Sequence, residues 1–310
     1  MQFPLFKPQT EWVKPEKFPD LTDRQEVAID LETSDPDLKS RGSGSIIGNG
    51  KVVGIAVASE GYQGYFPFDH EGGGNLEKTK VIQWLRELCK SSSLKIFHNA
   101  MYDVCWILAM GIEIKGDIVD TMIAASLINE NRMRYDLNSL GREYVGFGKD
   151  EAALIAGAKE WGIDPKAEMW RLPAMYVGNY AERDAEVTYQ LWKKLKQELS
   201  NQDLGSIFEL ESDLFPCLVD MKFKGVRVDV EKAHILKKKL LEKEKPAMYK
   251  LRKKLVASKD LKSGMILTKD DIAIKIPGDG TPPHQLDLFI GEKLNKSILK
   301  DESLNIDHIN

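Results

Sequence analysis

The sequence predicts an α/β fold followed by a smaller module of different texture. Short apolar runs typical of strands occur at residues 26–32, 51–59 and 94–98. Between and after them, apolar residues recur at helical spacing, as in 76–89 and 173–196. These runs and helical stretches predict the α/β part. After about Ser258 the chain changes to glycine, proline and short apolar runs, which predicts the second module.

Length and composition predict a globular protein of one large domain or two unequal ones. The chain has 310 residues and no apolar run long enough to span a bilayer. The N-terminus lacks the basic-then-apolar pattern of a signal peptide. The three cysteines lie far apart without metal-ligand spacing, so we expect reduced thiols in a cytoplasmic protein without membrane partners.

The net charge of −4 conceals a basic segment. Residues 222–262 hold 15 Lys or Arg and only 5 Asp or Glu. Such a segment can follow a nucleic-acid backbone, or it can be the solvated face of a long helix.

The first third of the chain predicts an irregular lead-in and then a meander of strands. Residues 1–24 contain four prolines and several aromatic residues, and we expect them to drape over the core. Strands are expected at 26–32 and 51–59, with a turn at Gly61 and Gly64 before a third strand that begins at Tyr65. A helix at 76–89 and a fourth strand at 94–98 follow.

The remainder predicts mostly helices. The expected elements are a helix to Met110, a short strand at 117–121, helices at 122–127 and 137–145, a mixed surface stretch at 149–166, helices within 173–196 and at 202–224, and a Lys-rich helix at 230–255 that Pro246 interrupts. The tail predicts short strands, turns at Pro277-Gly278 and Gly280, and a short helix near 286–290.

Two acids on the first strand are the strongest chemical signal. Strand side chains alternate, so Asp30 and Glu32 share one face while Val27, Ile29 and Leu31 share the other. Adjacent carboxylates repel unless a cation lies between them, and Mg²⁺ and Mn²⁺ prefer oxygen ligands. Taken alone, the same pattern also fits a strand end with solvated acids.

Two further acids follow in helical contexts. Asp103 lies about one turn beyond the junction between the fourth strand and its helix. Asp184 lies on a later helix, and Tyr180, four residues earlier, shares its face.

These residues stand in motifs that carry a family resemblance. D-L-E-T, H-N-A-M-Y-D and Y-A-E-R-D, in that order, resemble the three motifs of the tyrosine-containing DEDD exonucleases. The flanking text, including D-T-M-I-A-A-S-L-I-N and Y-D-L-N-S-L, resembles the proofreading domain of DNA polymerase I-type (family A) enzymes. The resemblance covers about residues 20–245.

The resemblance implies a ribonuclease H-like fold, a mixed sheet flanked by helices, and 3′-to-5′ removal of nucleotides from single-stranded or frayed DNA ends. Asp30, Glu32, Asp103 and Asp184 would then hold two divalent metal ions, Mg²⁺ or Mn²⁺. Tyr180 would orient the attacking water, and Thr33 and Asn99 would lie near the substrate. Asn99 is equally suited to cap the helix that follows it.

Phosphodiester hydrolysis needs these chemical groups. It requires a hydroxide-like nucleophile, neutralised charge on the phosphorane and a stabilised leaving oxygen, and two nearby metal ions supply all three. Without metal the acids would repel each other, and at least one should have a raised pKa.

The family pattern stops near residue 245, where a family A polymerase would continue through thumb, palm and fingers. We therefore expect no DNA synthesis by this chain, although a separate polymerase subunit is a conceivable partner. The tail instead resembles the antifreeze-like (SAF) domain of sialic acid synthases, a β-clip. Its turn reads K-I-P-G, with Ile276 where that family carries an arginine. The catalytic barrel of those synthases is absent, so sialic acid synthesis is not expected.

The predicted organisation has four parts: a lead-in at 1–24, an exonuclease domain at 25–200, a helical segment at 201–249 and an SAF-like domain at 250–310. Alternatives stay open. The chain could grip a DNA end without cutting it, or trim RNA. Its tail could bind carbohydrate or oligomerise, and the join near Pro246 could be a natural fusion or a chimera.

Overall fold

A computed structural model describes residues 10–276 and 280–310. They form two units, one ending at Gly225 and the other beginning at Val226. The first unit contains five strands: β1 (Glu26–Ser34), β2 (Lys51–Ser59), β3 (Tyr62–Pro67), β4 (Leu94–Phe97) and β5 (Ile118–Asp120). Its α-helices are α1 (Gly44–Ile47), α2 (Lys78–Lys90), α3 (Ala100–Ala109), α4 (Thr121–Ile128), α5 (Leu137–Leu140), α6 (Ala152–Trp161), α7 (Gly178–Asn201) and α8 (Gly205–Lys224).

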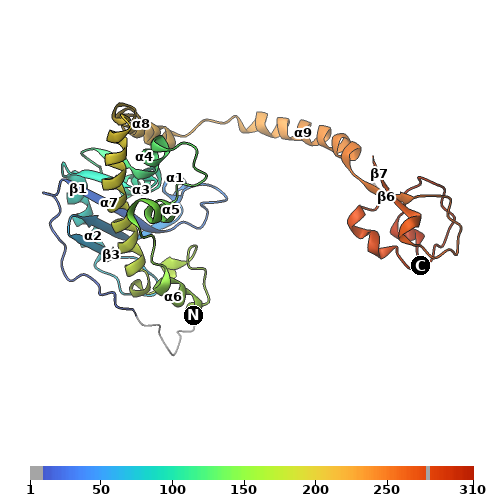
Figure 1. Ribbon diagram of the computed structural model, residues 1–310, viewed down its shortest axis with the longest axis horizontal. Helices are drawn as coiled ribbons and strands as arrows, with labels where there is room; N and C mark the ends of the chain where they lie inside the picture. The colour runs from blue at the N-terminus through green and yellow to red at the C-terminus, as the bar shows by residue number, and fades with distance from the viewer. Residues whose placement is uncertain (1–9, 277–279) are drawn as a thin grey trace. The chain divides into compact units, whose positions relative to one another are not determined.

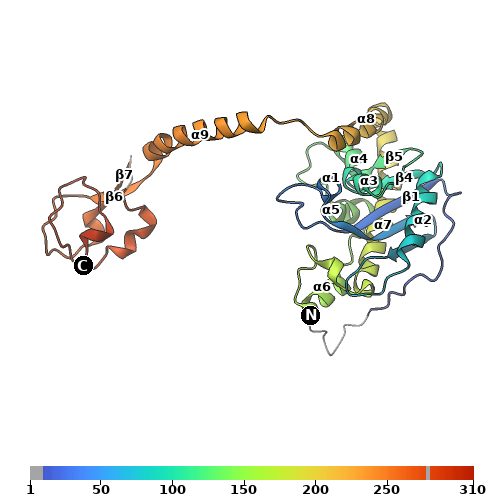
Figure 2. The same cartoon turned by 180° about the vertical axis from the view of Figure 1, so that it is seen from behind.

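The five strands form one mixed sheet in the order β3-β2-β1-β4-β5. The first three strands pair antiparallel as a meander, and β4 and β5 add in parallel. Helix α7 lies across one face of the sheet and α2 lies on the other (Figures 1 and 2). The predicted mixed sheet flanked by helices is therefore confirmed.

Each face of the sheet has its own apolar core. The α7 face buries side chains of α4, α5, α6 and α7 against Ala28, Ala56 and Tyr65. The opposite face buries Val27 and Ile29 beneath α2, α3 and part of α8. The alternation of side chains along β1 thus supplies residues to both cores.

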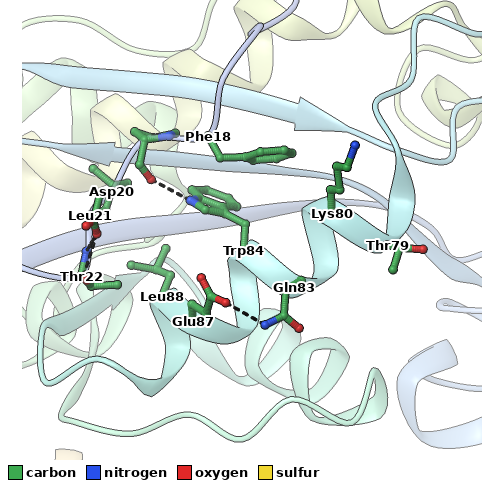
Figure 3. A pocket seen from close by; sticks show the side chains of 11 residues that line it. Phe18, Asp20, Leu21, Thr22, Thr79, Lys80, Gln83, Trp84, Glu87 and Leu88 are labelled. Atoms are coloured by element: carbon green, nitrogen blue, oxygen red, sulfur yellow. Dashed lines mark hydrogen bonds between the residues drawn. The ribbon is translucent and has the colours of Figure 1, made fainter.

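The lead-in is irregular in the described residues and packs on both cores, as predicted. Trp12 belongs to the α7-face core, while Leu21 belongs to the other core and Phe18 packs against it. With α2 the lead-in lines an open pocket of about 610 Å³, where the Trp84 indole donates to the carbonyl of Pro19 at 2.8 Å (Figure 3). This pocket borders α2, on the sheet face opposite α7.

Two local predictions are wrong. Gly64 does not form the turn but pairs with Val57 inside β3, and its missing side chain leaves room for the Tyr62 side chain, whose hydroxyl a Cβ would approach to 2.5 Å. Pro246 does not interrupt its helix: α9 (Val230–Leu251) continues through it. A proline removes one intrahelical hydrogen bond, and in α9 the rest of the ladder continues past that loss.

The second unit contains α9 and a small module. Strands β6 (Lys254–Ala257) and β7 (Ile272–Lys275) pair antiparallel, and 3₁₀ turns occur at Lys269–Asp271, Pro283–Leu288 and Ile306–His308. A separate core includes Leu255, Phe289 and Leu304. Ile276 is exposed, and the predicted turn at Pro277-Gly278 lies outside the described residues. In the described part of the chain, no helix is long and apolar enough to span a bilayer.

Candidate active site

Strand β1 presents its two acids toward α7. Asp30 pairs in register with Ala56 of β2, and Glu32 pairs with Gly54. Val27, Ile29 and Leu31 point into the opposite core, as predicted from the alternation. The register shifts between Glu32 and Thr33, which is a β-bulge directly after the acids. Glu32 is buried, and Asp30 is partly exposed.

The other two predicted acids come from two helices. Asp103, in the first turn of α3, accepts a hydrogen bond from the backbone N–H of Leu31 at 3.0 Å, which fixes its carboxylate against β1. Asp184 lies on α7 with 2% exposure, one turn after Tyr180. Asp30 and Asp184, more than 150 positions apart in the sequence, are therefore near enough for the charge of one to act on the other.

The four carboxyl groups affect one another's protonation. Burial, and then the charge of Asp184, raise the pKa of Asp30 to about 7, although Lys149 lowers it. Burial and the neighbouring acids raise the pKa of Glu32 well above its usual value, and burial with the Asp30 charge does the same for Asp103. Burial also raises the pKa of Asp184 against the lowering effect of Lys149.

Lys149 is a site residue that the sequence reasoning missed. Its ammonium pairs with the Asp184 carboxylate and donates to the Tyr180 hydroxyl at 3.1 Å. Its side chain is only 24% exposed, so this end of the predicted surface stretch turns inward. A lysine in a segment that connects two helices is usually solvated, so the sequence does not predict that Lys149 turns inward. The preceding Gly148 marks a close approach of the backbone, because a Cβ there would come within 2.2 Å of the Asn138 side chain.

The site fits a divalent cation by the chemistry of its donors. Glu32 Oε1 and Asp184 Oδ1 are buried and have no hydrogen-bond partner within residues 10–276 and 280–310. Buried carboxylate oxygens without partners are costly, and a hard cation would satisfy them. Among the described residues, no three acidic, histidine or cysteine side chains stand close enough to hold an ion as they lie. Lys149 instead supplies the positive charge to these acids.

Thr33 follows Glu32 on β1, and Asn99 directly precedes α3, which carries Asp103. Thr33 shares a hydrogen bond of 2.7 Å with the Tyr102 hydroxyl, which also donates to Asp35 at 3.1 Å. Asn99 occupies the cap position of α3 with φ of 65°, but its side chain makes no capping hydrogen bond. Asp120 accepts from the N–H groups of Asn99 and Ala100 instead. The side-chain cap is therefore not made, and substrate contact stays a prediction.

Comparison with known proteins places this geometry in a family. Residues 16–200 match the family model for a 3′-5′ exonuclease of the DNA polymerase A type, and residues 252–310 match the SAF domain. A DNA-directed DNA polymerase of Pseudomonas phage M6 is 37% identical over 260 residues, which cover 81% of this chain and 39% of that protein. DNA polymerase I of Pseudomonas aeruginosa is 28% identical over 72% of this chain and 24% of that protein.

The solved structures that resemble this chain have low sequence identity to it. Brucella melitensis NrnC bound to pGG has a TM-score of 0.47 and 18% identity, covering 66% of this chain and 88% of that one. The chain spans about a third of the length of the curated relatives it matches. With the family model covering more than half of its residues, this chain belongs to the 3′-5′ exonuclease family of DNA polymerase I-type proteins, and it carries an exonuclease domain together with an SAF domain.

Proposed function

We propose that this chain is a metal-dependent 3′-to-5′ exonuclease of the proofreading type, which hydrolyses nucleotides from DNA 3′ ends. The observation that carries the proposal is that Asp30, Glu32, Asp103 and Asp184 lie near enough for their charges to act on one another, and that Glu32 Oε1 and Asp184 Oδ1 are buried without hydrogen-bond partners among the described residues. Family membership supports the same chemistry.

The four acids would act as ligands. Two divalent ions, Mg²⁺ or Mn²⁺, would supply the neutralised charge and the hydroxide-like nucleophile that phosphodiester hydrolysis needs. Asp103 is held against β1 by the Leu31 N–H, so its carboxylate is already oriented before any ligand arrives.

Tyr180 and Lys149 would serve the nucleophile. Burial and the charges of Glu32 and Asp184 raise the pKa of Tyr180 well above its usual value, so its phenol stays protonated near neutral pH. A protonated phenol can hold and orient a water molecule but cannot take its proton. Lys149 donates to that phenol and pairs with Asp184, so it would fix the positions of both groups relative to each other.

DNA is the proposed substrate because the relatives are named as DNA polymerases. The proposed partner for DNA synthesis is a separate polymerase subunit.

The proposal is tested with purified chain, a 5′-labelled single-stranded DNA and Mg²⁺ or Mn²⁺. We expect products that shorten one nucleotide at a time and no reaction in excess chelator, with activity returning when metal is restored. Replacing either of two ligands, Asp30→Ala or Asp184→Ala, should reduce the rate by about 10³-fold or more, because each removes several kcal/mol of charge stabilisation. Asp213→Ala, at an exposed acid of α8, is the matched control.

Three outcomes would contradict the proposal in different ways. Full activity in either ligand variant would refute the site. Release from RNA but not from DNA would favour RNA trimming. Tight binding of DNA ends without release at any metal concentration would favour an end-binding module.

A further inference from the structure

The lead-in reaches the helix that carries two of the site residues. Trp12 precedes residue 16, where the match to the exonuclease family begins. Its indole lies directly against Gly178, the first residue of α7, where a Cβ would come within 2.1 Å of the ring. Thr10 adds a hydrogen bond from its hydroxyl to the carbonyl of Met175 at 3.1 Å. The start of α7 is therefore packed against a segment from the other end of the domain sequence.

Glu182 joins three elements through one oxygen. Its Oε1 accepts from the Trp12 indole N–H at 2.8 Å and from the backbone N–H of Tyr65 in β3 at 3.0 Å. Glu182 lies on α7 midway between Tyr180 and Asp184. The lead-in, the sheet and α7 are thus tied at the turn of the helix that bears the site residues.

A second set of contacts joins the sheet to the segment before α7 through buried side chains. Tyr65 lies in the cross-strand row that also contains Ala56 and Asp30, and its hydroxyl covers Gly54, the partner of Glu32. Burial and the charges of Glu32 and Asp30 raise the pKa of Tyr65 well above its usual value, so its hydroxyl keeps its proton.

The hydroxyl of Tyr65 bonds to His70 Nε2 at 2.6 Å, and His70 Nδ1 lies 3.1 Å from the carbonyl of Leu172. Because a carbonyl only accepts, Nδ1 must carry the proton of the neutral ring and Nε2 must accept from Tyr65. The hydrogen bonds that run from Tyr65 through His70 therefore end at Leu172, in the segment that leads into α7.

We propose that Trp12, Glu182, Tyr65 and His70 form a latch that positions the first turns of α7 over β1. They act as positioning residues that set where Tyr180 and Asp184 stand relative to Asp30 and Glu32. This inference rests on the proposed exonuclease activity. A displacement of about 1 Å at a reacting centre can cost about 10²-fold in rate, so a latch outside the site can control turnover.

Glu182→Met tests the latch, because it keeps side-chain volume but leaves two buried N–H groups without an acceptor. We expect kcat for a short DNA strand to fall about 10-fold to 100-fold, with KM unchanged within about twofold. Glu182→Gln keeps an acceptor oxygen and should restore kcat to within about threefold. Trp12→Phe keeps an aromatic ring but removes one donor, so its loss should be smaller than that of Glu182→Met.

Glu198→Met, on the same helix but more than four turns away, is the matched control and should leave kcat unchanged. Hydrogen exchange of the amides between Gly178 and Asp184 gives a second measurement that does not depend on turnover. Exchange there should be faster in Glu182→Met than in Glu198→Met.

Unchanged exchange in Glu182→Met would overturn the latch whether or not the chain cuts DNA. Equal kcat in Glu182→Met and the unmodified chain would overturn it as well, and so would equal losses in Glu182→Met and Glu182→Gln. If Glu182→Met does not fold, Trp12→Phe carries the same two measurements. An inactive unmodified chain that still shows the exchange difference would refute the exonuclease proposal and leave the latch standing.

Discussion

The two faces of β1 differ in what they contribute to the molecule. On one face Val27, Ile29 and Leu31 are buried beneath α2 and α3 in an apolar core. On the other face Asp30 and Glu32 lie under α7, where burial and the charges of neighbouring acids raise their pKa values. Alternate residues of β1 therefore have opposite effects on stability. Burial of the apolar residues stabilises the fold, whereas ionisation of the buried acids destabilises it.

Because successive side chains of a strand point to opposite faces, residues that stabilise the fold and residues of the candidate site can alternate along one strand. The apolar face can hold the strand in place while carboxylate oxygens near the acidic face lack hydrogen-bond partners among the described residues. The orphan oxygens of Glu32 and Asp184 are found on the acidic side. Substitutions at neighbouring positions should therefore change stability in opposite directions.

The largest effect is expected on the apolar face. Ile29→Ala removes a side chain that is 1% exposed and leaves a cavity in a tight core. The free energy of unfolding should fall by about 3 kcal/mol, with or without metal, because the loss comes from packing alone. Denaturant unfolding of the isolated chain measures it. A loss that vanished in saturating Mg²⁺ would show that the two faces are not independent.

A smaller loss of stability is expected when Lys149, whose ammonium offsets the charge of the acids, is replaced. Lys149→Met removes the ammonium that pairs with Asp184 and leaves the buried acids without it. In chelator at pH 8 the free energy of unfolding should fall by about 2 kcal/mol. This is below the loss for a fully buried pair, because the side chain of Lys149 is partly exposed and the acids can take up protons.

Added Mn²⁺ should then raise the melting temperature of Lys149→Met more than that of the unmodified chain, because the ion replaces the missing charge. Lys159→Met, on the neighbouring helix α6, is the control and should change neither value. Equal stabilisation of both proteins by Mn²⁺ would argue against a shared position for the ammonium and the metal.

Much of the acidic face followed from the sequence because the signals are local. The alternation of V-A-I-D-L-E predicts which side chains share a face, and the structure confirms that Val27, Ile29 and Leu31 lie opposite the acids. That Asp103 and Asp184 come close to this strand followed only from the resemblance. Spacing along a chain does not encode a meeting of residues more than 70 positions apart.

The contacts that the sequence did not reveal all depend on side-chain direction. Lys149 follows a glycine in a connecting segment, where the sequence predicted a solvated surface stretch. Trp12 and Glu182 resemble an ordinary core aromatic and an ordinary helix-surface acid, and only the fold makes them partners. Gly64 was misassigned because a glycine that makes room for a ring has the same sequence signal as a glycine in a turn.

The smallest effect, and one of opposite sign, is expected at Asp30. Its pKa in the folded chain is raised to about 7, whereas that of an unfolded aspartate lies near 3.8. Between these values the folded state binds more protons than the unfolded state, so stability falls as the pH rises from about 4 to 7. At pH 8 in chelator the full cost of ionising Asp30 is present.

Asp30→Asn removes that cost but also removes the attraction between Asp30 and Lys149, and the cost is reduced because Asp30 is partly exposed. In chelator at pH 8 the net free energy of unfolding should exceed that of the unmodified chain by about 1 kcal/mol, or about 2–4 °C in melting temperature. At pH 4.5 the gain should largely disappear, because the folded chain already holds Asp30 protonated. Thermal unfolding at both pH values measures the difference, and Asp37→Asn, in the loop after β1, provides the control. A gain that did not depend on pH would mean that the acidic face stores no ionisation cost at Asp30, and the contrast between the two faces of β1 would then rest on the apolar side alone.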